Sequence, residues 1–264
     1  MLLAYAEMVR IRFLTMLAYR LNYFSGILTY LAYIGGYYFL WRAIYAGRAE
    51  LGGLTAVQMT TYLAVSYMTR AFYFNNLDGE IAEEIKTGAV AMQLLRPYHY
   101  LVGKLVGALG EGGFRLLFWM LPGMLLASLL FPVHLPGSPV TYSLWALAGV
   151  LAFCINAEIN ALVGMLVFFL HSSQGLMWGK RLAQDLLGGL FLPLSFYPGR
   201  LHAILRFLPF QAVSYLPNLV FTGALTGAAA WGALGLQLLW VGILAVLVLL
   251  LWRRARHVLV VQGG

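Results

Sequence analysis

Charged residues are scarce in this sequence. Only 10% of its 264 residues are Asp, Glu, Lys or Arg, whereas 62% are hydrophobic. A soluble domain carries about 25% charged and about 45–50% apolar residues. Too few charges are therefore present to cover a soluble globular surface, and the abundance of apolar residues excludes an intrinsically disordered chain. What remains is an all-α, polytopic membrane protein.

Cysteine and catalytic motifs are also lacking. The single cysteine, Cys154, cannot form an intrachain disulfide or a CxxC pair. The patterns HExxH, GxSxG and the Walker A loop do not occur, and no paired histidines suggest a metal site. We therefore expect no catalytic residues, no metal and no cofactor bound by this chain. If ATP powers its function, another subunit must bind the ATP.

The apolar stretches predict six membrane spans within a single transmembrane domain, residues 1–264. A span needs about 20 mostly apolar residues, and prolines at 132, 136 and 139 divide the longest charge-free stretch into two. The expected spans are Leu21–Trp41, Leu54–Thr69, the two halves of Leu116–Ala157 with the second reaching Gly179, Leu182–Leu194, and Trp231–Trp252.

Residues 1–20 are too often interrupted by charge to be a cleaved signal peptide. Their apolar residues could share one face, which is typical of an amphipathic helix lying at the membrane interface. A cytosolic extension of the first span is the alternative.

The basic residues predict the orientation. With a cytoplasmic N-terminus, six spans place both termini inside and distribute the cations unequally. The inside then holds Arg10, Arg12, Arg20, Lys86, Arg96, Lys104, Lys180, Arg181, Arg253, Arg254 and Arg256, and the outside holds Arg42, Arg48, Arg200 and Arg206. The net charge of +8 is thus mainly a topology signal, and we expect no nucleic-acid binding.

The longest cytoplasmic connection, between spans two and three, is acidic. Four of the nine acidic residues fall within seven positions: Asp78, Glu80, Glu83 and Glu84. Asp78 is the expected helix N-cap, Gly88 the expected break, and Pro97 the end of the segment. The segment is either a plain connecting helix or a docking element for a cytosolic partner, and charge patterning does not separate the two.

Glu158 stands inside an apolar run, beside Asn156 and Asn160. A carboxyl at a helix centre costs roughly 2.5–3.5 kcal/mol on insertion scales, so such groups usually face protein or water. The alternatives are a structural hydrogen bond between helices, and contact with a cationic substrate or a proton on a transport path.

Other polar residues of the spans have the spacing of ion pairs. Lys104, Glu111 and Arg115 share a helix face, either as a paired surface or as the lining of an inward cavity. Asp185 follows Arg181 by four residues, which favours a local ion pair.

Four stretches carry a resemblance to a known family. They are the Tyr-Arg-x-Asn start within Ala18–Phe24, the acidic turn with I-x-x-G and L-L-R-P within Glu80–Pro97, the end of span five at Gly188–Pro198, and the Leu208-Pro209-Phe210 and Tyr215-Leu216-Pro217 pair. Together with six spans, they resemble the permease subunit of a bacterial type-2 ABC exporter. The branch it looks most like is that of the drug or viologen exporters.

The resemblance implies an ATP-driven multidrug-efflux type of complex in the bacterial inner membrane. Two cytosolic ATPase subunits, which hold ATP and Mg, would bind beneath a pair of permeases formed with a second copy or a paralogue. Residues 78–97 would be the coupling helix, residues 1–20 an interfacial helix, and residues 197–227 an outer re-entrant region.

The implied coupling contacts are Asp78, Glu80, Glu83, Glu84, Lys86, Gly88, Arg96 and Pro97. The implied outer gate is Pro193, Phe196, Pro198, Pro209 and Pro217. The resemblance does not identify the substrate. The rival interpretations are a secondary transporter driven by an ion gradient, with Glu158 and Asp185 as proton sites, and a membrane scaffold without transport.

Overall fold

The computed structural model describes residues 2–18, 20–170 and 174–262. These residues form an almost entirely helical protein. In chain order the elements are α1 (Leu2–Ala18), α2 (Arg20–Ile44), β1 (Glu50–Leu51), β2 (Leu54–Thr55), α3 (Ala56–Tyr73), α4 (Leu77–Lys86), α5 (Ala89–Leu94), α6 (Tyr100–Arg115), the π-turn η1 (Leu116–Met120), α7 (Leu121–Leu130), α8 (Pro139–Met165), η2 (Leu166–Phe168), α9 (Gln174–Leu187), η3 (Leu194–Phe196), α10 (Gly199–Leu205), η4 (Pro209–Ala212), α11 (Tyr215–Phe221) and α12 (Gly227–Gln262).

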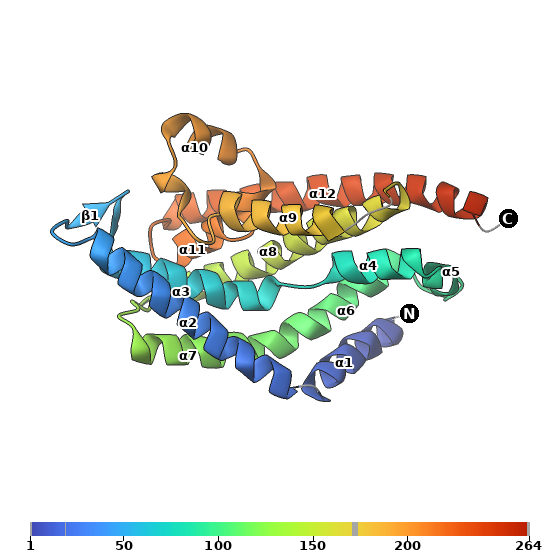
Figure 1. Cartoon of the computed structure of the whole chain (residues 1–264), viewed down its shortest axis with the longest axis horizontal. Coiled ribbons are helices and arrows are strands. Elements are labelled where there is room, and N and C mark those ends of the chain that lie inside the picture. The colour runs from blue at the N-terminus through green and yellow to red at the C-terminus, as the bar shows by residue number, and fades with distance from the viewer. Residues whose placement is uncertain (1, 19, 171–173, 263–264) are drawn as a thin grey trace.

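The long helices run along a common direction and give the molecule two distinct ends (Figure 1). One end carries the β1–β2 hairpin, α10 and the turn between α7 and α8. The opposite end carries α4, α5 and both ends of the chain. The predicted coupling segment and the predicted outer segment therefore lie at opposite ends of the bundle.

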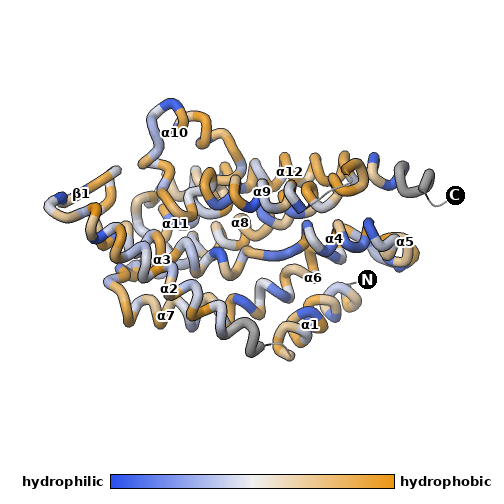
Figure 2. The backbone as a smooth tube through the Cα atoms, in the orientation of Figure 1, coloured by the Kyte–Doolittle hydropathy of each residue, from blue (hydrophilic) through white to orange (hydrophobic). Residues whose placement is uncertain are grey.

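Three helices within the described residues are long and apolar enough to cross a membrane: Tyr100–Leu130, Pro139–Phe168 and Gly227–His257. Figure 2 shows the hydrophobic colour along much of α7 and α12. The helices α2 and α3 have 25 and 18 residues, and α9 has only 14. The prediction of an all-α membrane protein is confirmed.

The helix ends follow local chemistry. Thr55 and Gln58 form a capping box at the start of α3, because each side chain bonds the other's backbone N–H. The fifth predicted span, Leu182–Leu194, is wrong in its bounds. Helix α9 ends at Leu187, and Gly189 then adopts a φ of +80°, a conformation that favours glycine. The helix α9 therefore ends, and the chain changes direction, before Pro193.

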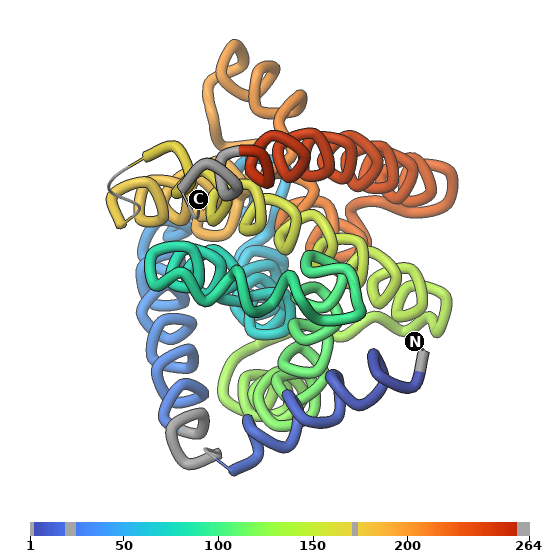
Figure 3. The backbone as a smooth tube through the Cα atoms, turned by 90° about the vertical axis from the view of Figure 1, so that its right-hand side faces the viewer, coloured from blue at the N-terminus to red at the C-terminus, as the bar shows by residue number. Residues whose placement is uncertain are grey.

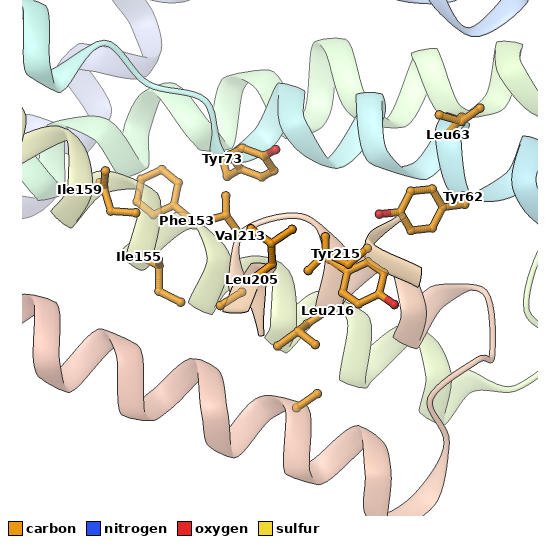
Figure 4. Close-up of a cluster of buried hydrophobic side chains, with 14 of the residues drawn as sticks. Tyr62, Leu63, Tyr73, Phe153, Ile155, Ile159, Leu205, Val213, Tyr215 and Leu216 are labelled. Carbon is orange, nitrogen blue, oxygen red and sulfur yellow. The ribbon is translucent and has the colours of Figure 1, made fainter. Parts of the chain in front are cut away.

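The largest buried cluster joins α3, α8 and the segment from α10 to α12. Figure 4 shows ten of its aromatic and aliphatic side chains: Tyr62, Leu63, Tyr73, Phe153, Ile155, Ile159, Leu205, Val213, Tyr215 and Leu216. The segment that follows α9 is thus built into the core.

Helix α1 lies across the bundle when viewed along its length (Figure 3). It packs on α6, where Gly110 allows a close approach. A Cβ atom at Gly110 would stand 2.4 Å from the carbonyl oxygen of Val9. Leu3 and Leu14 are exposed, so the predicted apolar face of residues 1–20 is only partly covered by protein.

Candidate functional site

The acidic segment folds as two short helices at one end of the molecule. Helix α4 ends at Lys86, Gly88 takes a φ of +74°, and α5 begins at Ala89. The predicted break at Gly88 is confirmed. The N-cap prediction for Asp78 is wrong, because Asn76 occupies the cap position and Asp78 is a buried residue of the first turn.

Three of the four clustered acidic side chains face the protein. Glu80 pairs with Arg12 and stands 3.5 Å from Lys104 Nζ. Glu84 accepts from Lys104 at 2.7 Å and from the Tyr100 hydroxyl at 2.6 Å. These bonds attach α4 to α1 and α6 rather than presenting the carboxylates to solvent.

Asp78 also faces inward. Its carboxylate accepts from Lys180 of α9 at 2.7 Å, and both side chains are buried. The pair connects the start of α4 to a helix 102 positions away in the sequence.

The surface that α4 and α5 leave open is mixed and partly apolar. Met92 and Leu95 are 68% and 79% exposed. Five of the predicted coupling residues are also exposed: Glu83, Lys86, Gly88, Arg96 and Pro97. We call this surface, residues 83 and 86–97, the α4–α5 tip. Sequence reasoning missed its apolar side chains as contact candidates.

The polar face of α6 is paired internally. Arg115 donates to Glu111 at 2.6 Å, and Glu111 stands 3.2 Å from Arg12. Burial alone would lower the pKa of the Arg12 guanidinium, but Glu80 and Glu111 outweigh it and raise that pKa, so Arg12 stays charged. The predicted Glu111–Arg115 pair is present, but both side chains are buried, and Lys104 and Glu111 also line a cavity, so the pair does not exclude the alternative. Arg12 carried no signal in the sequence, because its partners are 68 and 99 positions away.

A second polar cluster holds α8 against the residues that link α3 to α4. Asn156 donates to the Tyr73 carbonyl at 2.8 Å and accepts from Gln184 at 2.8 Å. Asn160 donates to the Asn75 side chain at 2.8 Å and accepts from Lys180. Both asparagines therefore use the nitrogen and the oxygen of the amide to join α8 to its neighbours.

Asp185 does not pair with Arg181 as expected. It pairs with Arg70 of α3, and the Arg181 guanidinium lies 5.2 Å from the ring centroid of Phe74. The local i,i+4 pair is replaced because α9 turns Asp185 toward the interior, where Arg70 is also largely buried.

Glu158 is separated from its two asparagine neighbours. Two residues along an α-helix rotate a side chain by about 200°, so Glu158 points away from the face that holds Asn156 and Asn160. It is 8% exposed, and its Oε2 atom has no hydrogen-bond partner among the described residues. The structure thus does not gather the three predicted transport-path residues into one site.

The predicted outer-gate residues lie at the end opposite the α4–α5 tip (Figure 1). Pro193, Pro198 and Pro209 each stand at the start of a short helix, whereas Pro217 is buried inside the first turn of α11. Phe196 packs on Trp41 with ring centroids 5.2 Å apart. Three of the four prolines therefore break the chain, and Pro217 does not.

Within the described residues, no three His, Cys, Asp or Glu side chains gather as ligands of a metal ion would. The side chains of the Tyr-Arg-x-Asn stretch that contributed to the resemblance lie outside the described part of the chain. Tyr19 is not described, and neither are the side chains of residues 20–24.

Comparison with known proteins adds one finding. Residues 31–263 match the family described as ABC-2 family transporter protein. No curated protein matches the chain. The matched region includes α3 to α11 completely, and so both the α4–α5 tip and the outer segment.

Proposed function

Because the chain belongs to the ABC-2 transporter family, a family of membrane transport components, we propose that it is the permease subunit of an ATP-driven exporter. In this proposal six helices span the bacterial inner membrane with both termini in the cytoplasm. Cytosolic ATPase subunits supply ATP hydrolysis, with ATP and Mg held by them. The chain itself moves the substrate outward, and drug-like compounds are the substrate class that the sequence resemblance favours.

The observation that carries the proposal is the α4–α5 tip. Met92 and Leu95 are 68% and 79% exposed, and the exposed charged residues Lys86 and Arg96 lie on either side of them in the sequence. Large exposed apolar side chains rimmed by polar residues are typical of protein interaction sites. We propose that the side chains of Met92 and Leu95 insert into the ATPase as the apolar anchors of the interface, and that Glu83 and Lys86 form its polar rim.

The bonds behind the tip support a coupling role. Glu80 and Glu84 attach α4 to α1 and α6, and Asp78 attaches it to α9. Helix α4 also lies directly on α8, because a Cβ atom at Gly164 would stand 3.0 Å from the Asp78 carbonyl oxygen. Displacement of α4 by a partner would consequently move α8 and α9, and the partner could shift the population between inward-open and outward-open states.

The docking proposal is tested with Met92→Glu combined with Leu95→Glu. We expect co-purification of the ATPase to fall about tenfold or more, because anchors of this kind contribute about 2 kcal/mol or more to an interface. The matched control is Gln174→Glu with His257→Glu, which adds two acidic residues at exposed positions outside residues 83 and 86–97. Equal recovery of the ATPase with both double variants would show that the tip is not the docking surface.

The exposed face of α9 supports pairing with a second permease. Its polar side chains, Lys180 and Asp185 among them, turn inward, whereas Trp178 and Leu182 are 65% and 59% exposed. Small residues allow close packing of membrane helices, and Gly179 lies on this outer face, where a Cβ atom would meet nothing within 4 Å. We propose that a second copy or a paralogue covers this face.

A further inference from the structure

A cavity of about 350 Å³ lies between α1, α4 and the first three turns of α6. Its polar lining includes Arg12, Glu80, Arg96, Tyr98, Lys104 and Glu111. Met8 and Ile11 of α1 add apolar wall. The cavity therefore combines charged and apolar surfaces beside the helix α1, at the end of the bundle that carries the α4–α5 tip.

The hydrogen-bond donors of this cavity are not all used. Arg12 and Lys104 are paired with Glu80, Glu84 and Glu111, but the buried Nε atom of Arg12 has no acceptor among the described residues.

Arg96 differs from the other two cations. Its guanidinium donates to the Tyr98 hydroxyl at 3.2 Å, and no carboxylate of the described chain lies within 4 Å of it. The lining holds three cations and two carboxylates, and a third carboxylate, Glu84, bonds Lys104 from outside the lining. The donors that remain for an anion are the Arg96 guanidinium and Arg12 Nε.

The position of the cavity beside the start of an apolar helix indicates which class of anion it binds. The apolar span Tyr100–Leu130 starts at the cavity, so the lining lies where a helix enters the bilayer. Basic pockets at the cytoplasmic ends of membrane helices bind anionic lipid headgroups. A guanidinium matches the oxygen geometry of a phosphate through paired hydrogen bonds.

We infer that this cavity binds the phosphate group of an anionic phospholipid from the inner leaflet. Arg96 contacts the phosphate, Arg12 Nε and Lys104 lie deeper as further donors, and Met8 and Ile11 contact the start of the acyl chains. The inference rests on the proposed orientation of the chain, but it requires neither ATP nor a docked ATPase.

The test uses the full-length chain purified in detergent without its ATPase. Binding is measured by native mass spectrometry and by thermal unfolding with three probes: short-chain phosphatidylglycerol, short-chain phosphatidylcholine and glycerol phosphate. Arg96→Gln removes the unpaired cation, and Arg254→Gln on α12 is the control for lost charge at an exposed position. Gly107→Leu fills the cavity, since a Cβ there meets nothing within 4 Å. Gly113→Leu is its control, equally unobstructed on the same helix and outside the lining.

We expect phosphatidylglycerol to bind and stabilise the protein, with an affinity about tenfold lower in Arg96→Gln, the loss expected for one charge-assisted hydrogen bond. Gly107→Leu should abolish binding, whereas both controls should keep it.

Equal binding by Arg96→Gln and Arg254→Gln would overturn the assignment of the phosphate to Arg96. Equal binding by Gly107→Leu and Gly113→Leu would overturn the cavity as the site. Glycerol phosphate that binds as tightly as phosphatidylglycerol would overturn the lipid as the source. None of these measurements depends on docking of the ATPase. A negative result would therefore overturn the lipid site without bearing on the proposed function.

Discussion

At the scale of single residues, buried polar groups fall into two kinds. Most have hydrogen-bond partners, and Asn160 is an example: its amide nitrogen donates to the Asn75 side chain at 2.8 Å, and its oxygen accepts from Lys180. Glu158 is different, because its carboxyl is buried with Oε2 unpartnered in the described chain. A buried polar group without a partner costs free energy, so its presence suggests a use other than stability.

Replacement of Glu158 by methionine should stabilise the protein. The substitution keeps the approximate volume and removes an unsatisfied group, whose burial costs about 1–3 kcal/mol. The measurement is thermal unfolding of the purified chain, with Asn160→Leu as the control, because both amide atoms of Asn160 have partners. The control should destabilise the protein, because it leaves the Asn75 oxygens without their donor and Lys180 without one of its acceptors. A lower unfolding temperature for Glu158→Met would contradict this account and indicate that the carboxyl has a structural partner.

Transport by the same variant separates the two interpretations of Glu158. If the carboxyl contacts a substrate or a proton, we expect transport to fall while the unfolding temperature rises. Unchanged transport would assign Glu158 no role on the path.

Residue-scale prediction from the sequence depended on separation along the chain. The pair Glu111–Arg115 was predictable because i,i+4 residues are neighbours on any helix. The pairs Arg12–Glu80 and Lys180–Asp78 were not, because 68 and 102 residues separate the partners. For the same reason Glu80 and Glu84, expected at the partner, instead bond within the chain.

At the scale of elements, the polar and apolar faces of α9 are arranged in the opposite way to those of an amphipathic helix in a soluble protein. Its charged side chains contact α3 and α4, while Gly175, Gly179, Leu182 and Leu186 form one exposed stripe. In a membrane this arrangement is favourable, because lipid accepts the apolar face and protein satisfies the polar one. The glycines of the stripe have no side chain, and small residues of this kind let the backbones of two membrane helices approach closely.

A leucine at Gly179 should therefore weaken pairing of two permeases. The added side chain would hold a facing helix away from α9, and we expect the cross-linked or co-purified dimer fraction to fall severalfold, as for a loss of about 1 kcal/mol. Gly242→Leu on α12 is the control, since it is also unobstructed and exposed. Dimer recovery that is the same for both variants would exclude the α9 stripe as the pairing surface.

Element boundaries were predictable where a residue type dictates the backbone. Gly88 was expected to break the helix, and it does so with a positive φ. The end of α9 was misplaced at Pro193, because Gly188 and Gly189 turn the chain first, and a glycine pair in an apolar run has no single expected conformation.

At the scale of the whole molecule, the two ends differ in what they carry. The tip, α1 and the C-terminal turns of α12 gather at one end, and the hairpin and α10 at the other (Figure 1). We propose that the first end faces the cytoplasm, as the cation asymmetry of the sequence predicts.

This orientation predicts the reactivity of engineered cysteines. In a Cys154→Ser background, Arg200→Cys should react with a membrane-impermeant thiol reagent in intact cells, whereas Arg254→Cys should react only after the cells are opened. Both positions are exposed, so accessibility of the side chain itself is matched. Labelling of Arg254→Cys in intact cells, with Arg200→Cys protected, would reverse the orientation.

Composition alone was enough to identify an all-α membrane protein, because the hydrophobic fraction and the scarcity of charge act through the solvent and not through particular contacts. Local rules added the helix break at Gly88 and the paired face of α6. Folding in three dimensions was needed to learn that the acidic cluster is largely bonded inward and that a charged cavity forms under α1. Each of these depends on residues distant in sequence, and their pairing follows from how whole helices pack, which no local pattern encodes.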